Sequence, residues 1–449
     1  MDATSGPVAA DIADAATLRV VDTFAAYYAA WGMTACVQAR AWALSATPNG
    51  TASLLGTAHR VAPETAAFVN GLTARSSELN DTLHVGGKQG GHPSDIIMPL
   101  LAVAEHRHAP GDSYLTAVVL GYEIFMRLFD LADVDAFDYT CLVAIAVAAA
   151  GATLLGANAT QVGHAVAIAA VANNGLRRAR LGRLTDWKCT ASGEGGRAGV
   201  FAASLAVHDF EGPADPFTGE SGWLEHVGNV TTVSGDPDWE LRRDSIARTI
   251  LKPRPACGSG MSATLAAEKA AAQLLRSNAA IGTIVIHTYG YAVRKLASQP
   301  HHWAPRSRAE ADHSLPYLVG ATLLHGRIRP ESFDDDARTD PRLTQLLDHI
   351  EVVECRRFTD AYESAVPEHH SRVTVTDPSG RDVAVAEVGG EHGEIAIDRP
   401  AEVRDKFTTY ARTHLRDDVR CLELLTQLES LRTVADVGDL VNAAVVNDD

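Results

Sequence analysis

The residues best suited to chemistry lie close together, in residues 80–95. This segment holds four glycines, two histidines, a lysine, a threonine and two aspartates, and an apolar stretch with helical spacing follows it. Glycines let a backbone approach a ligand closely, while histidine, lysine and carboxylates carry protons or bind charged groups. The segment therefore predicts part of an active site, with His92 as a proton carrier. Asp81, Thr82 and Lys88 are its candidate substrate-binding residues.

These residues also have structural interpretations. A histidine ahead of Pro93 can cap or pack a helix, and Asp81 and Thr82 have side chains that are common in turns. The glycine-rich surroundings favour a functional role for His92. For Asp81 and Thr82 both interpretations remain open.

A second candidate region, residues 177–188, reverses the sign of the chain's charge. It contains five cationic residues, although the chain as a whole carries a formal net charge of −17. Arginine binds carboxylates through two parallel hydrogen bonds and lysine supplies a point charge, so the region suits a polyanionic small molecule. Arg180, Arg183 and Lys188 are the candidates, and Lys188 between Trp187 and Cys189 has the least exposed setting. A solvated basic face is the alternative.

Two further residues could contribute to a site. Lys252 lies in a stiff, proline-containing segment at a change in sequence character, from which its side chain could reach a cleft. Tyr317 begins an apolar helical stretch and could donate a proton. The structural alternatives are a solvated lysine and a core tyrosine with a bonded hydroxyl.

Composition limits the class of protein. With 449 residues, 46% hydrophobic and 21% charged, the chain should form two or three globular domains. The acidic balance argues against a nucleic-acid or membrane partner. Six separated cysteines without a Cys-x-x-Cys pair predict no metal site and reduced thiols, and the first residues do not resemble a signal peptide, so we expect a cytoplasmic protein.

The hydrophobic pattern predicts a mainly α fold with an α+β part. Apolar residues recur at helical spacing up to about residue 210, whereas strand-like runs such as 281–289 and 371–376 appear later. We therefore expect an all-helical domain interrupted by a smaller α+β lid domain, with a ligand cleft between them. The expected boundaries are 1–248 for the helical domain, 249–398 for the lid, and 399–449 for C-terminal helices that return to the helical domain.

Several motifs together resemble the 2-methylcitrate dehydratase and cis-aconitate decarboxylase family, the MmgE/PrpD superfamily. The resemblance covers most of the chain and is closest to the 2-methylcitrate dehydratase branch. The motifs that carry it are Asn80-Asp81-Thr82, His92-Pro93-Ser94-Asp95, Gly121-Tyr122-Glu123, Trp187-Lys188, Lys252 with Pro255-Ala256, and Asp312-His313-Ser314-Leu315-Pro316-Tyr317.

The resemblance implies a homodimer whose cleft acts on small di- or tricarboxylates without a metal or an organic cofactor. Dehydration, decarboxylation and epimerisation all occur in the family. Matching the motifs residue by residue implies a site containing Thr82, His92, Lys188, Lys252 and Tyr317.

Two positions depart from the family pattern. Glu78 stands where aspartate is usual, and Tyr139 stands where the family often has a histidine. We include both among the candidate catalytic residues. A tyrosine with a pKa near its ordinary value of about 10 does not shuttle protons at neutral pH, so this exchange bears on the reaction.

The favoured function is a hydro-lyase that dehydrates a 2-methylcitrate-like tricarboxylate. Abstraction of a proton α to a carboxylate builds negative charge that lysines can stabilise, and loss of the hydroxyl needs an acid. Decarboxylation or epimerisation of a related acid, such as cis-aconitate, is the first alternative. A non-catalytic carboxylate-binding protein is the second.

Overall fold

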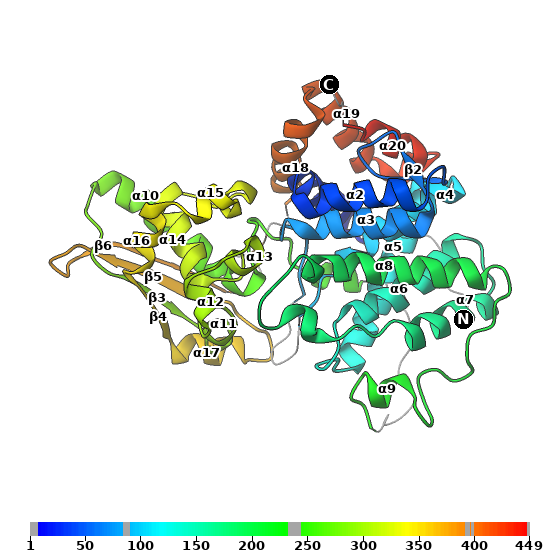
Figure 1. Cartoon of the computed structure of the whole chain (residues 1–449), viewed down its shortest axis with the longest axis horizontal. Coiled ribbons are helices and arrows are strands. Elements are labelled where there is room, and N and C mark those ends of the chain that lie inside the picture. Colours follow the sequence, from blue (N-terminus) through cyan, green and yellow to red (C-terminus); the bar gives the residue numbers. More distant parts are fainter. Residues whose placement is uncertain (1–7, 84–89, 232–243, 391–395, 397–398, 447–449) are drawn as a thin grey trace.

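The computed structural model describes residues 8–83, 90–231, 244–390, 396 and 399–446. Figure 1 shows a large helical part and a smaller part built around a sheet. This confirms the predicted fold class, mainly α with an α+β part.

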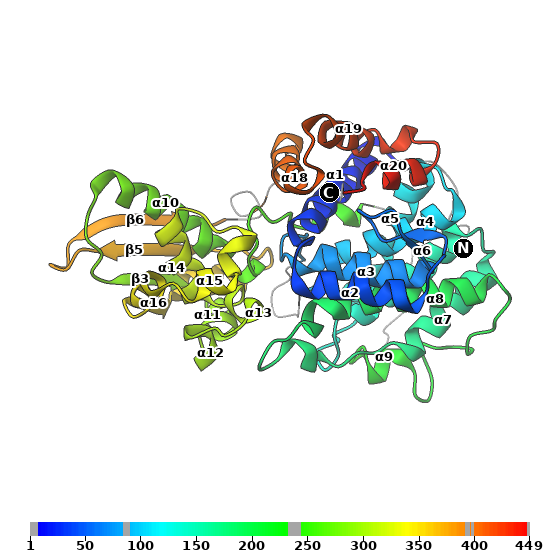
Figure 2. The ribbon, with the colours of Figure 1, turned by 45° about the horizontal axis from the view of Figure 1, so that its top comes forward.

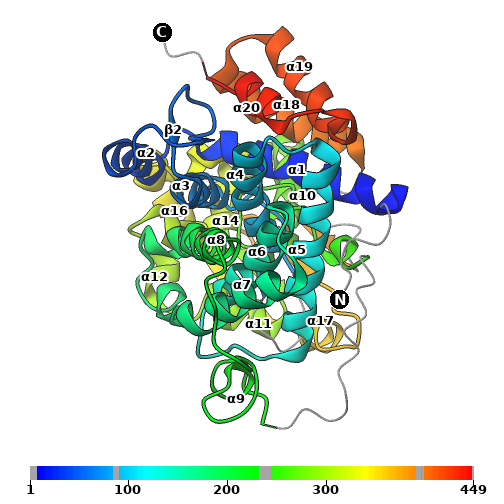
Figure 3. The ribbon, with the colours of Figure 1, turned by 90° about the vertical axis from the view of Figure 1, so that its right-hand side faces the viewer.

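The helical part is formed by the first half of the chain. Its helices are α1 (Ala10–Ala30), α2 (Thr34–Ala46), α3 (Pro63–Ser76), α4 (Ile97–Arg107), α5 (Gly111–Leu131), α6 (Thr140–Leu154), α7 (Ala159–Ala172), α8 (Trp187–Ala206) and α9 (Trp223–His226). Two short antiparallel strands, β1 (Ala52–Ser53) and β2 (Arg60–Val61), lie between α2 and α3. Figure 3 shows α9 at the edge of this part, away from the C-terminal helices.

The part built around a sheet, which we call the lid, follows along the chain. It contains α10 (Met261–Ser277), β3 (Ile284–Thr288), α11 (Gly290–Leu296), α12 (Pro300–Trp303), α13 (Arg308–Ala311), α14 (Leu315–His325), α15 (Asp335–Arg338), α16 (Pro341–Leu347), β4 (Ile350–Glu354), α17 (Arg356–Tyr362), β5 (Ser371–Thr376) and β6 (Asp382–Val388).

Short 3-10 turns occur in both parts of the chain, at η1 (Pro93–Ile96), η2 (Arg177–Arg180), η3 (Ser245–Arg248), η4 (Gly258–Gly260), η5 (Pro330–Phe333) and η7 (Leu431–Thr433).

The lid sheet has the strand order β4-β3-β5-β6. β3 pairs in parallel with β4 and antiparallel with β5, and β5 pairs antiparallel with β6. Buried residues alternate along β3 and β5, as expected for a sheet with one covered face. α10 and α14 pack on that face and share its core.

The helical core is centred on α6, whose residues are apolar around the whole helix and almost all buried. α5, α7 and α8 surround it. Such a helix suits the centre of a bundle. In the described part of the chain, no helix combines the length and apolar character that a membrane span requires.

Glycines bring α8 unusually close to its neighbours and so fix where it begins. A Cβ at Gly193 would lie 2.4 Å from the Phe68 carbonyl oxygen of α3, and one at Gly199 would lie 2.6 Å from the Val147 Cβ of α6. The sequence predicts a helix only from residue 195, because the glycines preceding it resemble a loop. The observed start at Trp187 instead places Lys188 in the first turn of a tightly packed helix.

Three C-terminal helices, α18 (Pro400–Leu415), α19 (Asp418–Glu429) and α20 (Val437–Ala443), belong to the helical core. α18 and α19 pack against α1, and α20 packs against α19 and α4. Figure 2 shows them over α1. Lys406 fixes this arrangement, because its Nζ donates to Asp22 Oδ1 at 2.6 Å, to the Leu79 carbonyl at 2.7 Å and to the Lys252 carbonyl at 2.9 Å. One buried ammonium thus joins α18 and α1 to two segments that lead to the cavity described below.

We predict that Lys406→Met lowers the free energy of unfolding by about 3–5 kcal/mol, because it leaves the buried Asp22 carboxylate without its cation. Denaturant unfolding followed by circular dichroism measures this. Lys269→Met, which removes an exposed lysine of α10, is the matched control and should stay within about 0.5 kcal/mol of the unchanged protein. Equal stability of the two variants would contradict the role given to Lys406.

Candidate active site

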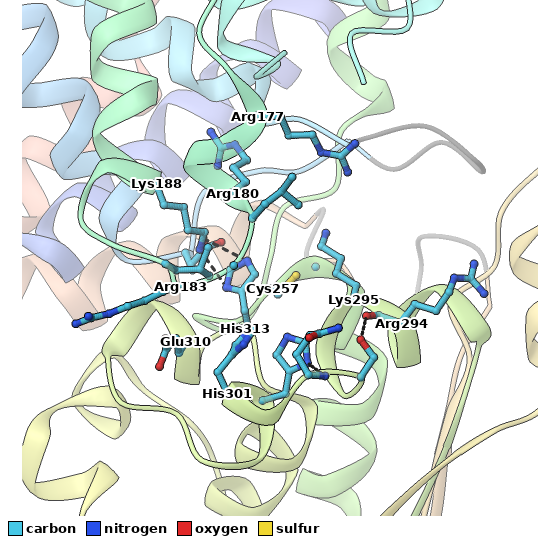
Figure 4. Close-up of a pocket in the computed structure, with 18 of the residues that line it drawn as sticks. Arg177, Arg180, Arg183, Lys188, Cys257, Arg294, Lys295, His301, Glu310 and His313 are labelled. Atoms are coloured by element: carbon cyan, nitrogen blue, oxygen red, sulfur yellow. Dashed lines mark hydrogen bonds and ion pairs between the residues drawn. The ribbon is translucent and has the colours of Figure 1, made fainter. Parts of the chain in front are cut away.

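A cavity of about 960 Å³ lies between the helical part and the lid. The helical part contributes residues from the end of α3, from the turn before α4, and from the segment that leads into α8. The lid contributes residues around η4 and from α11 to the start of α14. Figure 4 shows the cationic side chains from both sides directed toward this space.

Glu78 is the centre of the charged groups at the floor of the cavity. Its Oε1 lies 2.7 Å from Lys188 Nζ and 2.8 Å from Arg75 Nη1, and its Oε2 lies 3.2 Å from Lys252 Nζ. Burial raises the pKa of a carboxyl, but the three cations outweigh burial and hold the pKa of Glu78 well below its ordinary value. Glu78 is therefore an anchored carboxylate.

The backbone at Glu78 is as unusual as its charge environment. Glu78 has a φ of 56°, in the left-handed region that side-chain-bearing residues rarely adopt. This conformation follows the end of α3 and turns the carboxylate back toward Arg75, one helical turn earlier. Strain of this kind costs on the order of 1–3 kcal/mol and is found preferentially at functional sites.

Lys188 connects Glu78 to an Asp-His pair of the lid. Its Nζ lies 3.6 Å from Asp312 Oδ1 and 3.0 Å from His313 Nδ1, and that Nδ1 is 2.5 Å from Asp312 Oδ1. Burial lowers the pKa of Lys188, but the charges of Asp312 and Glu78 outweigh burial and the pKa is raised overall. The amine is therefore an ammonium. Burial and Lys188 lower the pKa of His313, yet Cys257 and Asp312 outweigh them and the net shift is upward.

One group of side chains has the donor types that a metal ion takes. The ligand atoms of Glu78, Asp312 and His313 all lie within 4.8 Å of one another. The Lys188 ammonium contacts both carboxylates and supplies the positive charge between them, while the Nδ1 of His313 is on Asp312. We therefore treat Glu78 and Asp312 as partners of Lys188 and do not assign this group of residues to a metal.

His92 is held in one neutral form. An arginine can only donate, so the 2.9 Å contact with Arg75 Nη2 makes His92 Nε2 an acceptor. The proton is then on Nδ1, which donates to the Asp81 carbonyl at 2.5 Å. Burial and the Arg75 charge keep the pKa of His92 well below its ordinary value.

Tyr139 borders the cavity with its ring, while its hydroxyl is directed to the protein. The hydroxyl donates to Asp95 Oδ2 at 2.8 Å, and Arg180 lies over the ring at 4.5 Å. Burial raises the pKa of Tyr139 above its ordinary value and raises that of Asp95 to about 6. Tyr139 is therefore a neutral phenol, not a proton shuttle at neutral pH.

The comparison with protein families covers both parts of the chain. Residues 2–235 match the MmgE/PrpD N-terminal domain and residues 255–429 match the MmgE/PrpD C-terminal domain. The chain belongs to the MmgE/PrpD family. The resemblance drawn from the sequence motifs is thereby confirmed.

Curated relatives are similar at a low level of identity. The chain is 27% identical to 2-methylcitrate dehydratase from Yarrowia lipolytica, over 71% of this chain and 63% of the relative. It is 28% identical to human cis-aconitate decarboxylase, over 65% and 62%, and 27% identical to 2-methylcitrate dehydratase from Cupriavidus necator, over 82% and 78%. The first two matches therefore span less than two thirds of the relatives' own length.

Most of the residues predicted for the site of this MmgE/PrpD member do border the cavity. They are Glu78, Thr82, His92, Tyr139, Arg180, Arg183 and Lys188. Thr82 is placed by two backbone hydrogen bonds with Ile250, at 2.9 and 2.8 Å, which tie the 80–82 segment to the chain entering the lid. Lys252 lies directly behind the cavity floor, with its ammonium on Glu78.

Two predicted residues, Asp81 and Tyr317, are not brought to the cavity. Asp81 is buried in the helical part, where its carboxylate accepts from the Ser94 backbone N–H at 3.0 Å and the Tyr122 hydroxyl at 3.0 Å. Tyr317 turns into the lid core, where its hydroxyl donates to the Ser332 carbonyl at 2.6 Å. Lys88 lies outside the described residues.

Other cavity residues were not predicted. In the sequence, Arg75 resembles an ordinary cation at a helix C-terminus. His313 lies in the same motif as Tyr317, and Tyr317 was the residue chosen as the candidate. A buried arginine and a His-Asp pair are recognised only once their partners are in place. The further unpredicted residues include Cys257, Arg294, Lys295, His301 and Arg306 of the lid, and Arg177, which pairs with Asp135.

We predict that Glu78→Gln lowers the free energy of unfolding by about 3–5 kcal/mol at neutral pH, since three buried cations then lack their shared carboxylate. Because the folded pKa of Glu78 is depressed, its contribution is complete above the ordinary value of 4.5 and is lost as the pH falls through the folded pKa.

The stability difference between the unchanged protein and Glu78→Gln should therefore shrink below pH 4.5. Urea unfolding at a series of pH values measures it. Parallel stability curves for the two proteins across this range would contradict the assignment.

Proposed function

We propose that this protein is a hydro-lyase that dehydrates a 2-methylcitrate-like tricarboxylate in the cavity between the two parts. The observation that carries the proposal is the charge of the cavity wall. Its lining includes eight arginine and lysine residues but only two glutamates, Glu78 and Glu310, in a chain whose net charge is −17. Such a local reversal of charge attracts a small polyanion.

Arg177 and Arg180 pair with Asp135 and Asp138, and the other cations in and behind the cavity wall form two groups. At the floor, Arg75, Lys188 and Lys252 are compensated by Glu78 and Asp312. At the rim, no acidic side chain of the described residues pairs with Arg183, Arg294, Lys295 or Arg306. The rim cations therefore have charge available for substrate carboxylates. The floor cations hold a fixed geometry, and Lys188, which borders the cavity, can add its charge to that of the rim.

The chemistry of dehydration matches these groups. A proton leaves the carbon α to a carboxylate, and the charge that develops on that carboxylate is stabilised by the Lys188 ammonium and the rim cations. A base must take the proton and an acid must assist the departing hydroxyl. Protein groups border the cavity in sufficient number to fill these roles without a metal, because Lys188 supplies the cation that a metal would provide.

The names of the relatives support the reaction class. Both the Yarrowia lipolytica and the Cupriavidus necator relatives are named 2-methylcitrate dehydratases. The human relative is named a cis-aconitate decarboxylase, so decarboxylation of a related acid is the second candidate. Dehydration needs a proton donor, and Tyr139, whose hydroxyl donates to Asp95, does not supply one at neutral pH. This observation favours the decarboxylase alternative.

The deciding experiment incubates purified protein with 2-methylcitrate, citrate and cis-aconitate and identifies products by mass spectrometry. We expect 2-methylcitrate to lose one water. Release of carbon dioxide from cis-aconitate would move the assignment to decarboxylase, and a change in optical rotation at constant mass would indicate an epimerase. Binding without conversion of any acid would contradict an enzymatic function on these substrates.

We predict that Lys188→Met lowers kcat/KM by about 100-fold or more, as removal of a single stabilising donor does. Folding should survive, because Arg75 and Lys252 still balance Glu78, and His313 still contacts Asp312. Thermal unfolding and steady-state kinetics measured together test this, with Lys269→Met as the control. If the Lys188→Met variant is unfolded at the temperature of the assay, the loss of activity would instead indicate a structural role for Lys188.

A further inference from the structure

Cys257 is the one cysteine that borders the cavity, and its surroundings differ from those of the other cysteines in the described chain. It is buried and immediately precedes η4. Figure 4 shows its sulfur between the His313 ring and the Lys295 side chain.

The backbone holds Cys257 against the Asp-His pair of the lid. Its N–H donates to the Asp312 carbonyl at 3.1 Å, so the residue next to His313 fixes the position of the cysteine. Lys252 Nζ donates to the Ala256 carbonyl at 3.3 Å and ties the same segment to the cavity floor. Because His313 Nδ1 is on Asp312 and the Cys257 sulfur lies beside the His313 ring in Figure 4, the three side chains follow one another as in arrangements that activate a nucleophile or a base.

The charges around the thiol favour its ionised form. The groups that face it are Lys295, His313, Glu78, Lys252, Tyr289 and Tyr362. Burial raises the pKa of Cys257, but Lys295 and a hydrogen bond with His313 outweigh burial and lower it to about 5. By contrast, burial raises the pKa of Cys36, Cys141, Cys189 and Cys421.

We propose that the Cys257 thiolate is the base that removes the α-proton of the substrate and that the His313 imidazolium is the acid that assists the leaving hydroxyl. This inference rests on the proposed hydro-lyase function. His92 is less suited to the role of base, because Arg75 occupies the lone pair of its Nε2 and Nδ1 already carries a proton.

The step balances within the protein. The thiolate takes the proton from the carbon α to a carboxylate, and the electron pair of that C–H bond forms the new double bond. The C–O bond to the hydroxyl breaks, and the departing hydroxide takes a proton from His313 and leaves as water. The proton on Cys257 then moves to His313, which restores the thiolate and the imidazolium for the next substrate.

The first test compares Cys257→Ser and Cys257→Ala with the unchanged protein. If the residue only fills space, serine should restore activity. If it is the base, both variants should lose about 100-fold or more in kcat, with little change in KM, because a serine hydroxyl does not ionise at neutral pH. Cys355→Ser, which changes a half-exposed cysteine outside the cavity, is the matched control. Full activity of either Cys257 variant would overturn the proposal.

A second test has a readout that does not need turnover. Iodoacetamide alkylation is carried out at about pH 8 and at about pH 6 and is followed by mass spectrometry of each cysteine peptide. When the pH falls from about 8 to about 6, an ordinary thiol loses nearly all of its thiolate. Cys257 should label at similar rates at both values, and His313→Gln should remove this behaviour. Citrate should protect Cys257 but not Cys355.

These two experiments separate the inference from the proposed function. If none of the three acids is converted while Cys257 labels as an ionised thiol, the hydro-lyase proposal fails and the activated thiol stands. If 2-methylcitrate loses water while Cys257 labels as an ordinary thiol, the hydro-lyase proposal stands and the assignment of Cys257 as base is overturned.

Discussion

The arrangement of this molecule depends on one buried carboxylate shared by three cations. Glu78 meets Arg75 from α3, Lys188 from the start of α8 and Lys252 from the chain entering the lid, at 2.8, 2.7 and 3.2 Å. None of these charges is easily buried alone, since removing a single charge from water costs several kcal/mol. Their mutual compensation fixes the end of α3, the start of α8 and the entry to the lid relative to one another.

A fixed floor determines what the rest of the cavity can do. Lys406 holds the backbone on both sides of the floor, at Leu79 and Lys252, so the C-terminal helices contribute to the site without touching the cavity. Because the floor charges compensate one another, we expect the rim cations Arg183, Arg294, Lys295 and Arg306 to determine the affinity for anions. His313 and Cys257, the proposed acid and base, both border this cavity.

The sequence predicts much of this architecture because local signals carry it. Apolar spacing locates the long helices and the lid strands, and the motifs at 80–82, 92–95 and 187–188 locate residues of the cavity. The start of α8 differs from prediction because helix packing against α3 and α6, not local propensity, determines that its glycines are helical. α2 (Thr34–Ala46) was not predicted, since much of its surface is exposed and its pattern is weak.

The parts of the site that the sequence does not predict depend on contacts between distant residues. Lys188 and His313 are separated by 125 positions in the chain, and only the packing of the lid on the helical part joins them. Tyr317 and His313 lie in one motif, but α14 begins between them and directs the tyrosine into the lid core. A motif identifies a segment, whereas the local backbone decides which of its side chains faces the ligand.

The most direct measurement is the crystal structure of the protein with propane-1,2,3-tricarboxylate, which has the carboxylates of the proposed substrate but no hydroxyl to lose. The account predicts that the ligand binds between floor and rim, with carboxylates on Lys188 and Lys295 and a methylene carbon facing Cys257. The crystals are prepared at a ligand concentration that saturates the protein in calorimetry. A ligand bound only outside this cavity, or a cavity without ligand at that concentration, would contradict the account.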